Sequence, residues 1–281
     1  MDPALNPSGE EMISGCGIGL RAPHVEEFLR VRPKVNVVEV YSEDYLGAEN
    51  TWLAALEEVR THYPLTLHGV GLSIGSSDPV NKRYLQRLRA LIRQVDPQRV
   101  SDHLAWCSLE DRYFCDQYPL PRQSDVLRHL VSRIGLVQDF LQRPLLLENI
   151  AYYLQPDGRG DYSEEDFLRA LVSQSGCQLL LDVENLRINC ENHGGDPWAF
   201  LGGLPIPAVT EIHVAGGEQV QVDGTVLSVD THSRAPGEQA RTLFAFACAH
   251  FPEAVRILEW DADLPSLSEL VRTAQSLESA V

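Results

Sequence analysis

Eight short apolar runs rich in β-branched residues recur along the whole chain, and each is followed by a turn and a segment of helical periodicity. The runs are apolar almost without interruption, which is typical of parallel strands that are buried on both faces. We therefore predict strands at residues 16–20, 37–41, 65–70, 99–103, 144–148, 178–183, 209–214 and 255–260. Amphipathic segments between them predict helices that include residues 51–60, 83–94, 126–141, 164–172, 238–249 and 267–274.

No linker or low-complexity tract interrupts this alternation of strands and helices. Eight β–α units in series are typical of a closed parallel barrel. The predicted fold class is therefore α/β, a (β/α)8 TIM barrel that forms a single domain. We place the barrel at residues 15–281 and an N-terminal extension at residues 1–14.

The chain of 281 residues has 23 Lys and Arg against 40 Asp and Glu, a formal net charge of −17. Proteins that bind nucleic acid need a basic face, and here no run of Lys and Arg exceeds two residues, so we exclude nucleic acid as a partner. The apolar runs are shorter than the roughly 18 residues that span a bilayer, and the N-terminus lacks the features of a signal peptide. We expect a cytoplasmic protein without a membrane partner.

The six cysteines are scattered and include no CxxC pair, which argues against a disulfide framework and a zinc ribbon. We expect most of them to be reduced and structural. Cys107 and Cys115 flank a predicted loop, and a redox role for these two stays open.

Two connections are longer than a minimal β–α loop, residues 107–121 after the fourth strand and residues 218–230 after the seventh. The second alternates around Asp223 and Gly224 as a β-hairpin does. Both follow strands at the C-terminal mouth of the predicted barrel, where long loops build active sites or docking surfaces.

Polar side chains close most of the predicted strands, and the C-terminal ends of all eight strands meet at one mouth. Four of the nine histidines fall at this end together with several carboxylates, although their motifs are far apart in the sequence. We expect the other five histidines to be ordinary core or surface residues. The residues at the mouth include Glu39, Glu43, His68, Asp102, His103, Glu148, Asn149, Asp182, Asn185, His213, Asp230, His232, Glu259 and Asp261.

Carboxylates gathered without basic neighbours repel one another and lose solvation, and bound cations remove this conflict. Imidazole and carboxylate donors without a thiolate fit iron, manganese or zinc, and about nine candidate ligands exceed what one ion needs. We therefore expect two or three metal ions. Arg21 closes the first strand and is the predicted substrate-binding residue, because a guanidinium can hold a carboxylate. The alternative is that Arg21 balances the charge of Glu39.

The motifs at these positions resemble those of the multinuclear non-haem iron-dependent oxidative enzymes. They occur in the same order from about Gly15 to the last strand. Together they are specific for this family, although no single motif would be. The motifs are GIGLR (17–21), HG (68–69), SDHLAW (101–106), LEN (147–149), LDVEN (181–185), IHVAG (212–216), DTHS (230–233) and LEWD (258–261).

The resemblance implies a barrel that holds two or three irons, with a mixed Fe(II)/Fe(III) pair and dioxygen as co-substrate. Members of this family modify cysteine residues of ribosomally synthesised precursor peptides, beside a small partner protein that captures the peptide. The methanobactin enzyme makes oxazolone and thioamide, and the 3-thiaglutamate enzyme excises the β-carbon of a C-terminal cysteine. The resemblance therefore implies an oxidase of a peptidyl cysteine in a heterodimer, and residues 107–121 favour the thiaglutamate-like branch.

Carried over position by position, the resemblance makes nine residues metal ligands and Glu148 the bridge between ions. Asp102 becomes a catalytic residue that orients His103 or accepts a proton. The chain departs from the family at Gly217, where members often have His, and at Glu184, where they have a second Asn. The nine ligands are His68, His103, Glu148, Asp182, Asn185, His213, Asp230, His232 and Glu259.

Two other kinds of function fit the same residues. One is a divalent-metal sugar isomerase or phosphodiesterase of the xylose-isomerase type, because a fold does not decide a function. A phosphodiesterase acting on DNA would need a basic groove, and an isomerase usually has a lysine at the strand ends, and we find neither. The other is a metal-binding scaffold or storage protein without catalysis, which predicts no oxygen consumption.

Overall fold

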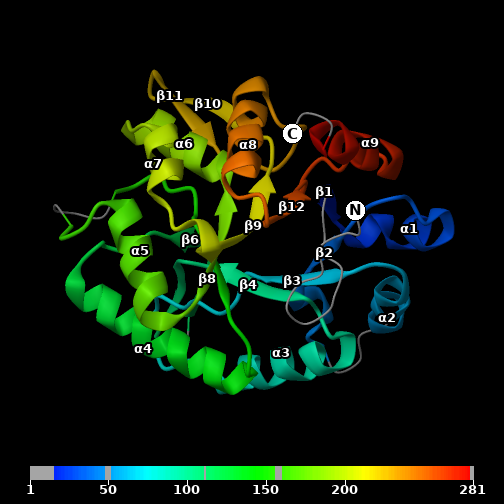
Figure 1. The fold of residues 1–281 in the computed structure, drawn as a ribbon, viewed down its shortest axis with the longest axis horizontal. Coiled ribbons are helices and arrows are strands. Elements are labelled where there is room, and N and C mark those ends of the chain that lie inside the picture. The colour runs from blue at the N-terminus through cyan, green and yellow to red at the C-terminus, as the bar shows by residue number, and fades with distance from the viewer. Residues whose placement is uncertain (1–15, 48–51, 111, 156–159, 279–281) are drawn as a thin grey trace.

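The computed structural model describes residues 16–47, 52–110, 112–155 and 160–278. Eight parallel strands pair with one another in a closed ring, which confirms the predicted α/β barrel. Their order around the ring is β1-β12-β9-β8-β7-β4-β3-β2, so each strand lies beside its neighbour along the chain (Figure 1). The N-terminal extension predicted for residues 1–14 lies outside the described residues.

Each barrel strand begins and ends within about two residues of its predicted position. The strands are buried almost throughout, as expected when helices cover the outside and side chains fill the inside. The barrel strands are β1 (Cys16–Gly19), β2 (Val38–Tyr41), β3 (Leu65–Gly69), β4 (Arg99–His103), β7 (Leu146–Glu148), β8 (Gln178–Asp182), β9 (Val209–Val214) and β12 (Val255–Leu258).

Helices surround the strands (Figure 1). The α-helices are α1 (Val25–Val31), α2 (Leu53–His62), α3 (Lys82–Val95), α4 (Ser124–Leu141), α5 (Glu164–Ser175), α6 (Val183–His193), α7 (Pro197–Gly203), α8 (Glu238–His250) and α9 (Leu267–Glu278). Short 3-10 helices are η1 (Ala22–His24), η2 (Ser42–Tyr45) and η3 (Ile206–Ala208).

Helix α4 shows why these segments fold as they do. Its buried apolar residues recur at intervals of three and four, so they form one stripe that packs on the barrel. The next helix, α5, is capped by Ser163, whose side chain accepts a hydrogen bond from the backbone N–H of Asp166 at 3.2 Å. Such an N-cap stabilises a helix by about 1 kcal/mol.

Two antiparallel hairpins extend from the mouth of the barrel. The predicted hairpin is present as β10 (Glu218–Val222) and β11 (Thr225–Val229), with Asp223 and Gly224 at positive φ of 49° and 82°. The other predicted long loop also contains a hairpin, β5 (Trp106–Leu109) and β6 (Arg112–Tyr118). The ring of Trp106 stacks on that of Tyr118 at 4.6 Å between centroids, which joins the two strands.

No disulfide links the six cysteines, all of which lie among the described residues. Cys107 is buried on β5 with its Sγ 3.2 Å from the hydroxyl of Tyr113, and Cys115 is exposed on β6. A redox role for these two stays open. In the part of the chain that the structure describes, no helix has the length and apolar character needed to cross a membrane.

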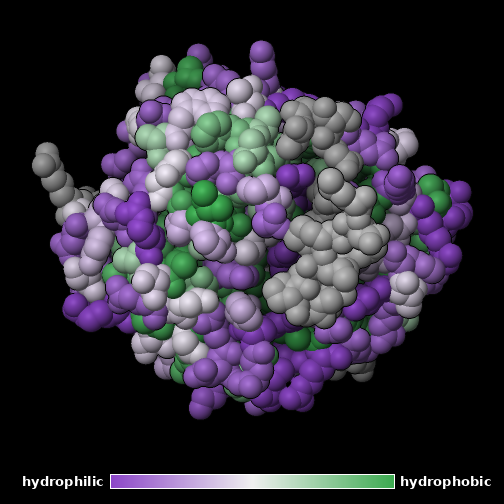
Figure 2. Space-filling model, in the orientation of Figure 1, coloured by the Kyte–Doolittle hydropathy of each residue, from purple (hydrophilic) through white to green (hydrophobic). Residues whose placement is uncertain are grey.

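The face shown in Figure 2 is mainly hydrophilic, in keeping with the net charge of −17. A hydrophobic patch lies over α8 in this view. Helix α8 exposes 40% of Phe246, which packs edge-on against Trp198 of α7 at 5.1 Å between ring centroids.

Candidate metal centre

The closed barrel brings the polar strand ends together because neighbouring parallel strands are paired in register. His103, the last residue of β4, is paired with Glu148, the last residue of β7. Asp182, the last residue of β8, is paired with His213 of β9. Glu259 follows β12 directly. Positions far apart in the sequence therefore become neighbours at the mouth, where barrel enzymes place their active sites.

The first group of possible ligands joins two histidines and one carboxylate. The Nε2 atoms of His68 and His103 both lie 3.2 Å from Oε2 of Glu148. The other ring nitrogens are held elsewhere: Nδ1 of His68 is 2.7 Å from the hydroxyl of Ser101, and Nδ1 of His103 is 3.1 Å from the carbonyl of Gly69. These contacts aim both Nε2 atoms at the same carboxylate oxygen.

The second group surrounds His213 and contains three carboxylates. Nδ1 of His213 lies 3.0 Å from Oε2 of Glu259 and 3.4 Å from Oε1 of Glu148. One ligand atom of Asp182 lies within 4.8 Å of one atom of each of these residues. All four residues are buried, and Glu148 belongs to both the first and the second group.

The third group lies around His232, which has a positive φ of 45°. Its Nε2 lies 2.7 Å from Oδ1 of Asp230, and its Nδ1 lies 2.9 Å from Oδ2 of Asp261 and 3.5 Å from Oε2 of Glu259. Glu259 therefore belongs to both the second and the third group. The three groups form one continuous cluster joined by Glu148 and Glu259, and a fourth group of possible ligands, Glu39, Glu211 and His213, adjoins it through His213.

Asn185 adjoins the cluster through a hydrogen-bonded ladder. Its Nδ2 donates to the carbonyl of Asn149 at 3.1 Å, and its backbone N–H donates to Oδ1 of Asp182 at 2.8 Å. The side chain of Asn149 in turn pairs with the backbone of Asp182. This ladder fixes the start of α6, so Asp182 and Asn185 are held in fixed positions relative to each other.

Several buried donor and acceptor atoms of the cluster have no hydrogen-bond partner. Buried polar atoms are nearly always satisfied, so such atoms gathered in one place need a further group to bind. Carboxylate, amide and imidazole atoms of this kind suit a hard or borderline metal cation. Asp182 Oδ2 and Asn185 Oδ1 have no hydrogen-bond partner, and Glu148 Oε2, Asp230 Oδ1 and His232 Nε2 lie in ion-pair contact with other side chains of the cluster without a hydrogen bond.

The electrostatics of the cluster agree with this donor set. Burial and the neighbouring Glu148 carboxylate raise the pKa of Asp182 well above its ordinary value. Burial alone would lower the pKa of His68, but the carboxylate of Glu148 outweighs it and raises that pKa to about 10. Both groups therefore hold protons more tightly than usual, and a cation bound here would compete with those protons.

A family model described as RiPP precursor modification enzyme MbnB/TglH/ChrH matches residues 15–281. The chain belongs to this family. A "UPF0276 protein" of Acaryochloris marina is 41% identical over 267 residues, which are 95% of each chain. Another from Anaeromyxobacter sp. is 40% identical over 269 residues, which are 95% of this chain and 93% of that one.

Solved structures similar to this MbnB/TglH/ChrH family member show the same barrel. A D-tagatose 3-epimerase-like protein has a TM-score of 0.63 at 15% identity, covering 95% of this chain and 97% of that one. A D-psicose 3-epimerase has a TM-score of 0.62 at 11% identity, with coverages of 95% and 97%. Endonuclease IV from Thermus thermophilus has a TM-score of 0.59 at 15% identity, with coverages of 95% and 98%. Identities this low establish the fold alone.

Asp102 lies beside the cluster and bonds to the backbone of His103 rather than to its imidazole ring, and its catalytic role stays a prediction. Its Oδ1 accepts from the backbone N–H of His103 at 2.8 Å, and its Oδ2 accepts from that of Leu72 at 3.1 Å. The carbonyl of Gly69 orients the imidazole instead. Burial and the nearby Glu43 raise the pKa of Asp102 to about 8.

Arg21 is buried against two carboxylates of the third group. Its Nε donates to Oδ1 of Asp261 at 2.6 Å, its Nη2 donates to Oε1 of Glu259 at 3.1 Å, and its guanidinium lies 4.0 Å above the ring of Tyr41. These contacts agree with charge balance, although the partners are not the expected Glu39. Only Nη1 has no partner, so binding of a substrate carboxylate by Arg21 stays a prediction.

Gly217 and Glu184, the two positions at which the resemblance predicts a departure from the family, are in contact. The backbone N–H of Gly217 donates to Oε1 of Glu184 at 2.9 Å, and Arg187 pairs with the same carboxylate. A Cβ on Gly217 would lie 2.5 Å from the carbonyl of Val229 and 2.8 Å from Oε1 of Glu184. Gly217 and Glu184 therefore form one linked feature that joins α6 to the hairpin β10–β11.

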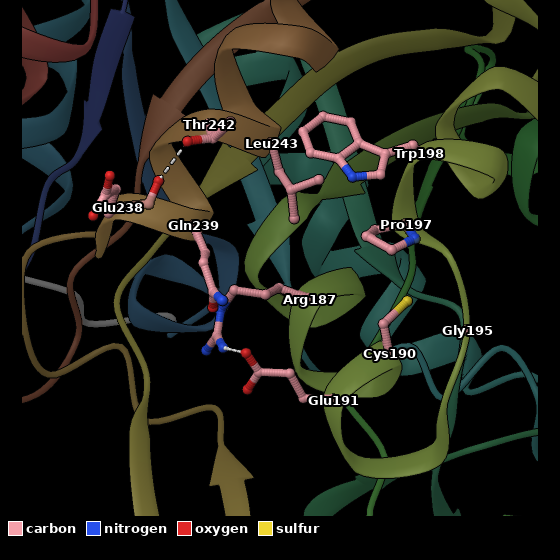
Figure 3. Close-up of a pocket in the computed structure, with 10 residues that line it drawn as sticks. All are labelled: Arg187, Cys190, Glu191, Gly195, Pro197, Trp198, Glu238, Gln239, Thr242 and Leu243. Atoms are coloured by element: carbon pink, nitrogen blue, oxygen red, sulfur yellow. Dashed lines mark hydrogen bonds and ion pairs between the residues drawn. The ribbon is translucent and has the colours of Figure 1, made fainter.

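A separate pocket lies outside the barrel between α6, α7 and the start of α8 (Figure 3). Its volume is about 430 Å³, and Arg187 and Glu191 form an ion pair of 2.6 Å on one wall. Its other lining residues include Cys190, Trp198, Gln239 and Leu243. None of the predicted ligands lines this pocket, so we do not assign it to the chemistry of the cluster.

Three carboxylates of the cluster were not predicted as ligands. Glu39 lies within β2 and Asp261 follows β12, and both were recognised only as polar residues of the mouth. Glu211 lies two residues before His213 in β9, so both side chains point into the barrel. A charged residue inside the otherwise apolar run of β9 is the feature that could have revealed it.

Proposed function

We propose that this enzyme is a multinuclear iron oxidase that uses dioxygen to modify a cysteine residue of a ribosomally synthesised precursor peptide. The observation that carries the proposal is the continuous cluster, in which Glu148 and Glu259 each belong to two of the four groups of possible metal ligands. Membership of a family of precursor-modifying enzymes supports a peptide substrate. Excision of the β-carbon from a C-terminal cysteine is the form of the reaction that we favour.

The donor atoms fit two or three irons with the nine predicted residues as ligands. Iron bound here would supply redox chemistry with dioxygen and would lower the pKa of a coordinated substrate thiol. Glu148 is suited to bridge, because its Oε2 faces two imidazoles and its Oε1 faces a third. Arg21 and Tyr41 hold Oε1 of Glu259, which leaves Oε2 turned toward His213 and His232.

The side chains of the cluster differ in exposure. Those of His68 and Glu148 are 1% exposed, whereas those of His103, Asp230 and Asp261 are 17%, 20% and 23% exposed. The proposal therefore has the peptide cysteine approach from these more exposed residues. The catalytic role of Asp102, one residue from His103, belongs to this proposal, with its carboxylate accepting a proton from the substrate.

A small partner protein that binds the peptide also belongs to the proposal, in a heterodimer with this chain. The hairpin β10–β11 supports a docking surface near the mouth, since Val220, Val222 and Val226 are 36%, 51% and 54% exposed. Exposed apolar side chains that gather on one element often mark an interaction surface. The cytoplasmic location stays a prediction.

The test begins with protein purified from iron-rich medium. We expect two or three irons per chain, with a coupled Fe(II)/Fe(III) pair in the Mössbauer spectrum. Addition of a precursor peptide that ends in cysteine should start oxygen consumption, measured with an electrode. Glu148→Ala and His213→Ala should lose bound iron and abolish turnover, because each removes a side chain that several others share.

The matched control is His62→Ala, which removes an exposed histidine of α2 far from the predicted ligands. It should keep the iron content and the rate of the unmodified enzyme. Full activity in both cluster variants would contradict the site. Stoichiometric zinc that persists under iron loading, without oxygen consumption, would favour the isomerase, phosphodiesterase or scaffold alternatives.

A further inference from the structure

Two further carboxylates reach His213 from inside the barrel. Glu39 of β2 and Glu211 of β9 are both 0% exposed. Oε2 of Glu39 lies 3.1 Å from Nε2 of His213, and Oε1 of Glu211 lies 3.8 Å from the same nitrogen. The hydroxyl of Thr66 lies 3.4 Å from both carboxylates. Neither glutamate is among the nine predicted ligands.

The imidazole of His213 therefore lies between two sets of carboxylates. Its Nδ1 faces Glu148 and Glu259 of the cluster, and its Nε2 faces Glu39 and Glu211. The two histidines of the first group have the opposite orientation. His68 and His103 turn Nε2 toward Glu148 and use Nδ1 for contacts with a hydroxyl and a backbone carbonyl.

A neutral imidazole that binds a cation through one nitrogen carries its hydrogen on the other. Carboxylates on the Nε2 side of His213 can accept that hydrogen, which satisfies both faces of a metal-bound ring. We propose that Glu39 is a positioning residue that fixes His213 with its hydrogen on Nε2 and presents Nδ1 to the metal. This inference rests on the proposed function only in taking the cluster as a metal site.

Glu211 and Thr66 complete the arrangement by holding Glu39 in place. Thr66 Oγ1 is within reach of Oε2 of Glu39 and of Oε1 of Glu211, the oxygens that face His213. All three residues are 0% exposed, so water does not compete for the Nε2 hydrogen. An anionic acceptor also raises the basicity of the ligating nitrogen, as carboxylates behind metal-bound histidines commonly do.

The first test reads the bound nitrogen of each histidine in the unmodified protein. The full chain is labelled with ¹⁵N-histidine, loaded with Zn²⁺ as a diamagnetic probe, and studied by long-range ¹H–¹⁵N correlation NMR. We expect one histidine bound to metal at Nδ1 with a slowly exchanging hydrogen on Nε2, and His68 and His103 bound at Nε2. Absence of a histidine bound at Nδ1 would overturn the inference, and this readout needs no variant to fold.

The second test compares Glu39→Gln with Thr66→Val. Replacing Glu39 by Gln keeps the shape but removes the charge, and should weaken Zn²⁺ binding in a chelator competition by about 10- to 100-fold. It should also shift the resonance of the hydrogen on His213 Nε2. Thr66→Val disturbs the same pair of carboxylates without touching the imidazole, and should weaken binding much less.

Failure of this inference and failure of the proposed function give different results. If the unmodified protein binds neither zinc nor iron, the proposed metal centre is wrong. If it binds metal, but His213 is bound through Nε2 or the two variants lose affinity equally, only the role of Glu39 is wrong. Glu39→Asp keeps the charge on a shorter side chain, so it should retain the Nε2 hydrogen and more affinity than Glu39→Gln, which a merely structural role would not produce.

Discussion

Gly216 follows β9 at a place where two backbone segments meet. A Cβ on this residue would lie 2.4 Å from the carbonyl oxygen of Arg234 and 2.5 Å from that of Ala235. The backbone N–H of Ser233 donates to the carbonyl of Gly216 at 3.2 Å, so the contact continues to the residue after His232. Glycine at this position therefore lets the segment that carries Asp230 and His232 lie against the end of β9.

Gly216→Ala should destabilise the fold, because both obstructing atoms belong to the backbone and cannot rotate away. We expect a loss of about 1–3 kcal/mol in the free energy of unfolding, the usual effect of overpacking. Denaturant unfolding measures the loss, and chelator competition should show weaker metal binding through the displaced His232. In Gly135→Ala, a matched change in α4 with nothing within 4 Å of the new Cβ, stability should rise instead. A Gly216→Ala variant as stable as Gly135→Ala would contradict this explanation.

The candidate site could be predicted mainly from the types of residue at the strand ends. Glu148 and Asp182 could be predicted to lie together because parallel strands of a barrel end at the same mouth. The side-chain contacts could not be predicted in the same way, since Asp102 bonds to backbone amides rather than to the ring of His103. Glu211 was missed because it lies within a strand rather than at its end.

The hairpin β10–β11 is held to the barrel by α6. The side chain of Asn192 donates to the carbonyl of Ser228 at 2.8 Å and accepts from its backbone N–H at 2.9 Å. The hydroxyl of Ser228 donates to Glu191, also in α6, at 2.5 Å. The chain reaches Asp230 one residue after the end of β11, so α6 controls where the third ligand group lies.

Asn192→Ala removes both hydrogen bonds to the backbone of Ser228 and should loosen the hairpin. We expect faster hydrogen exchange at the amides of β10 and β11, with an increase that corresponds to about 1–3 kcal/mol for the buried groups left unpaired. Hydrogen-exchange mass spectrometry makes the comparison. Gln221→Ala, an exposed change on the same hairpin, should leave the exchange unaltered. Equal exchange in both variants would show that α6 does not hold the hairpin.

The predictability of each element followed from its local chemistry. Asp223 and Gly224 readily adopt the positive φ of a tight turn, so the hairpin β10–β11 could be predicted from the sequence. The turn of β5–β6 has Glu110 at a positive φ of 51°, a residue type that does not mark such a turn. Helix α6 begins directly after β8, because Asp182 caps it. No turn motif separates the two elements, so the sequence did not indicate where the helix begins.

The stability of the whole molecule should depend on pH in opposite ways with and without metal. The pKa of His68 is raised from 6.5 to about 10, and the pKa of Asp102 to about 8. Groups with a raised pKa bind more protons in the folded than in the unfolded chain, so their stabilisation is present at lower pH and is lost as the pH rises through the folded pKa. The metal-free protein should therefore lose stability from pH 6.5 upward toward about 10.

The measurement is denaturant unfolding between pH 6.5 and about 9, with a chelator present and then with Zn²⁺. Metal binds the deprotonated ligands, so its affinity rises with pH and should cancel or reverse the loss. The control is the variant His68→Gln, which removes one of the groups with a raised pKa and should reduce the pH dependence of the metal-free protein. Constant stability of the metal-free protein across this range would contradict the charge arrangement described for the cluster.

If the groups hold metal ions as proposed, the sharing of Glu148 and Glu259 between neighbouring groups would make the occupancy of one group depend on the others. A cation bound between His68 and Glu148 would polarise the oxygen that faces His213, and one bound near His232 would do the same through Glu259. The free energy of binding is then coupled across the cluster, and by linkage the coupling is the same in both directions. A titration with metal should consequently follow a cooperative or stepwise isotherm rather than that of three independent sites.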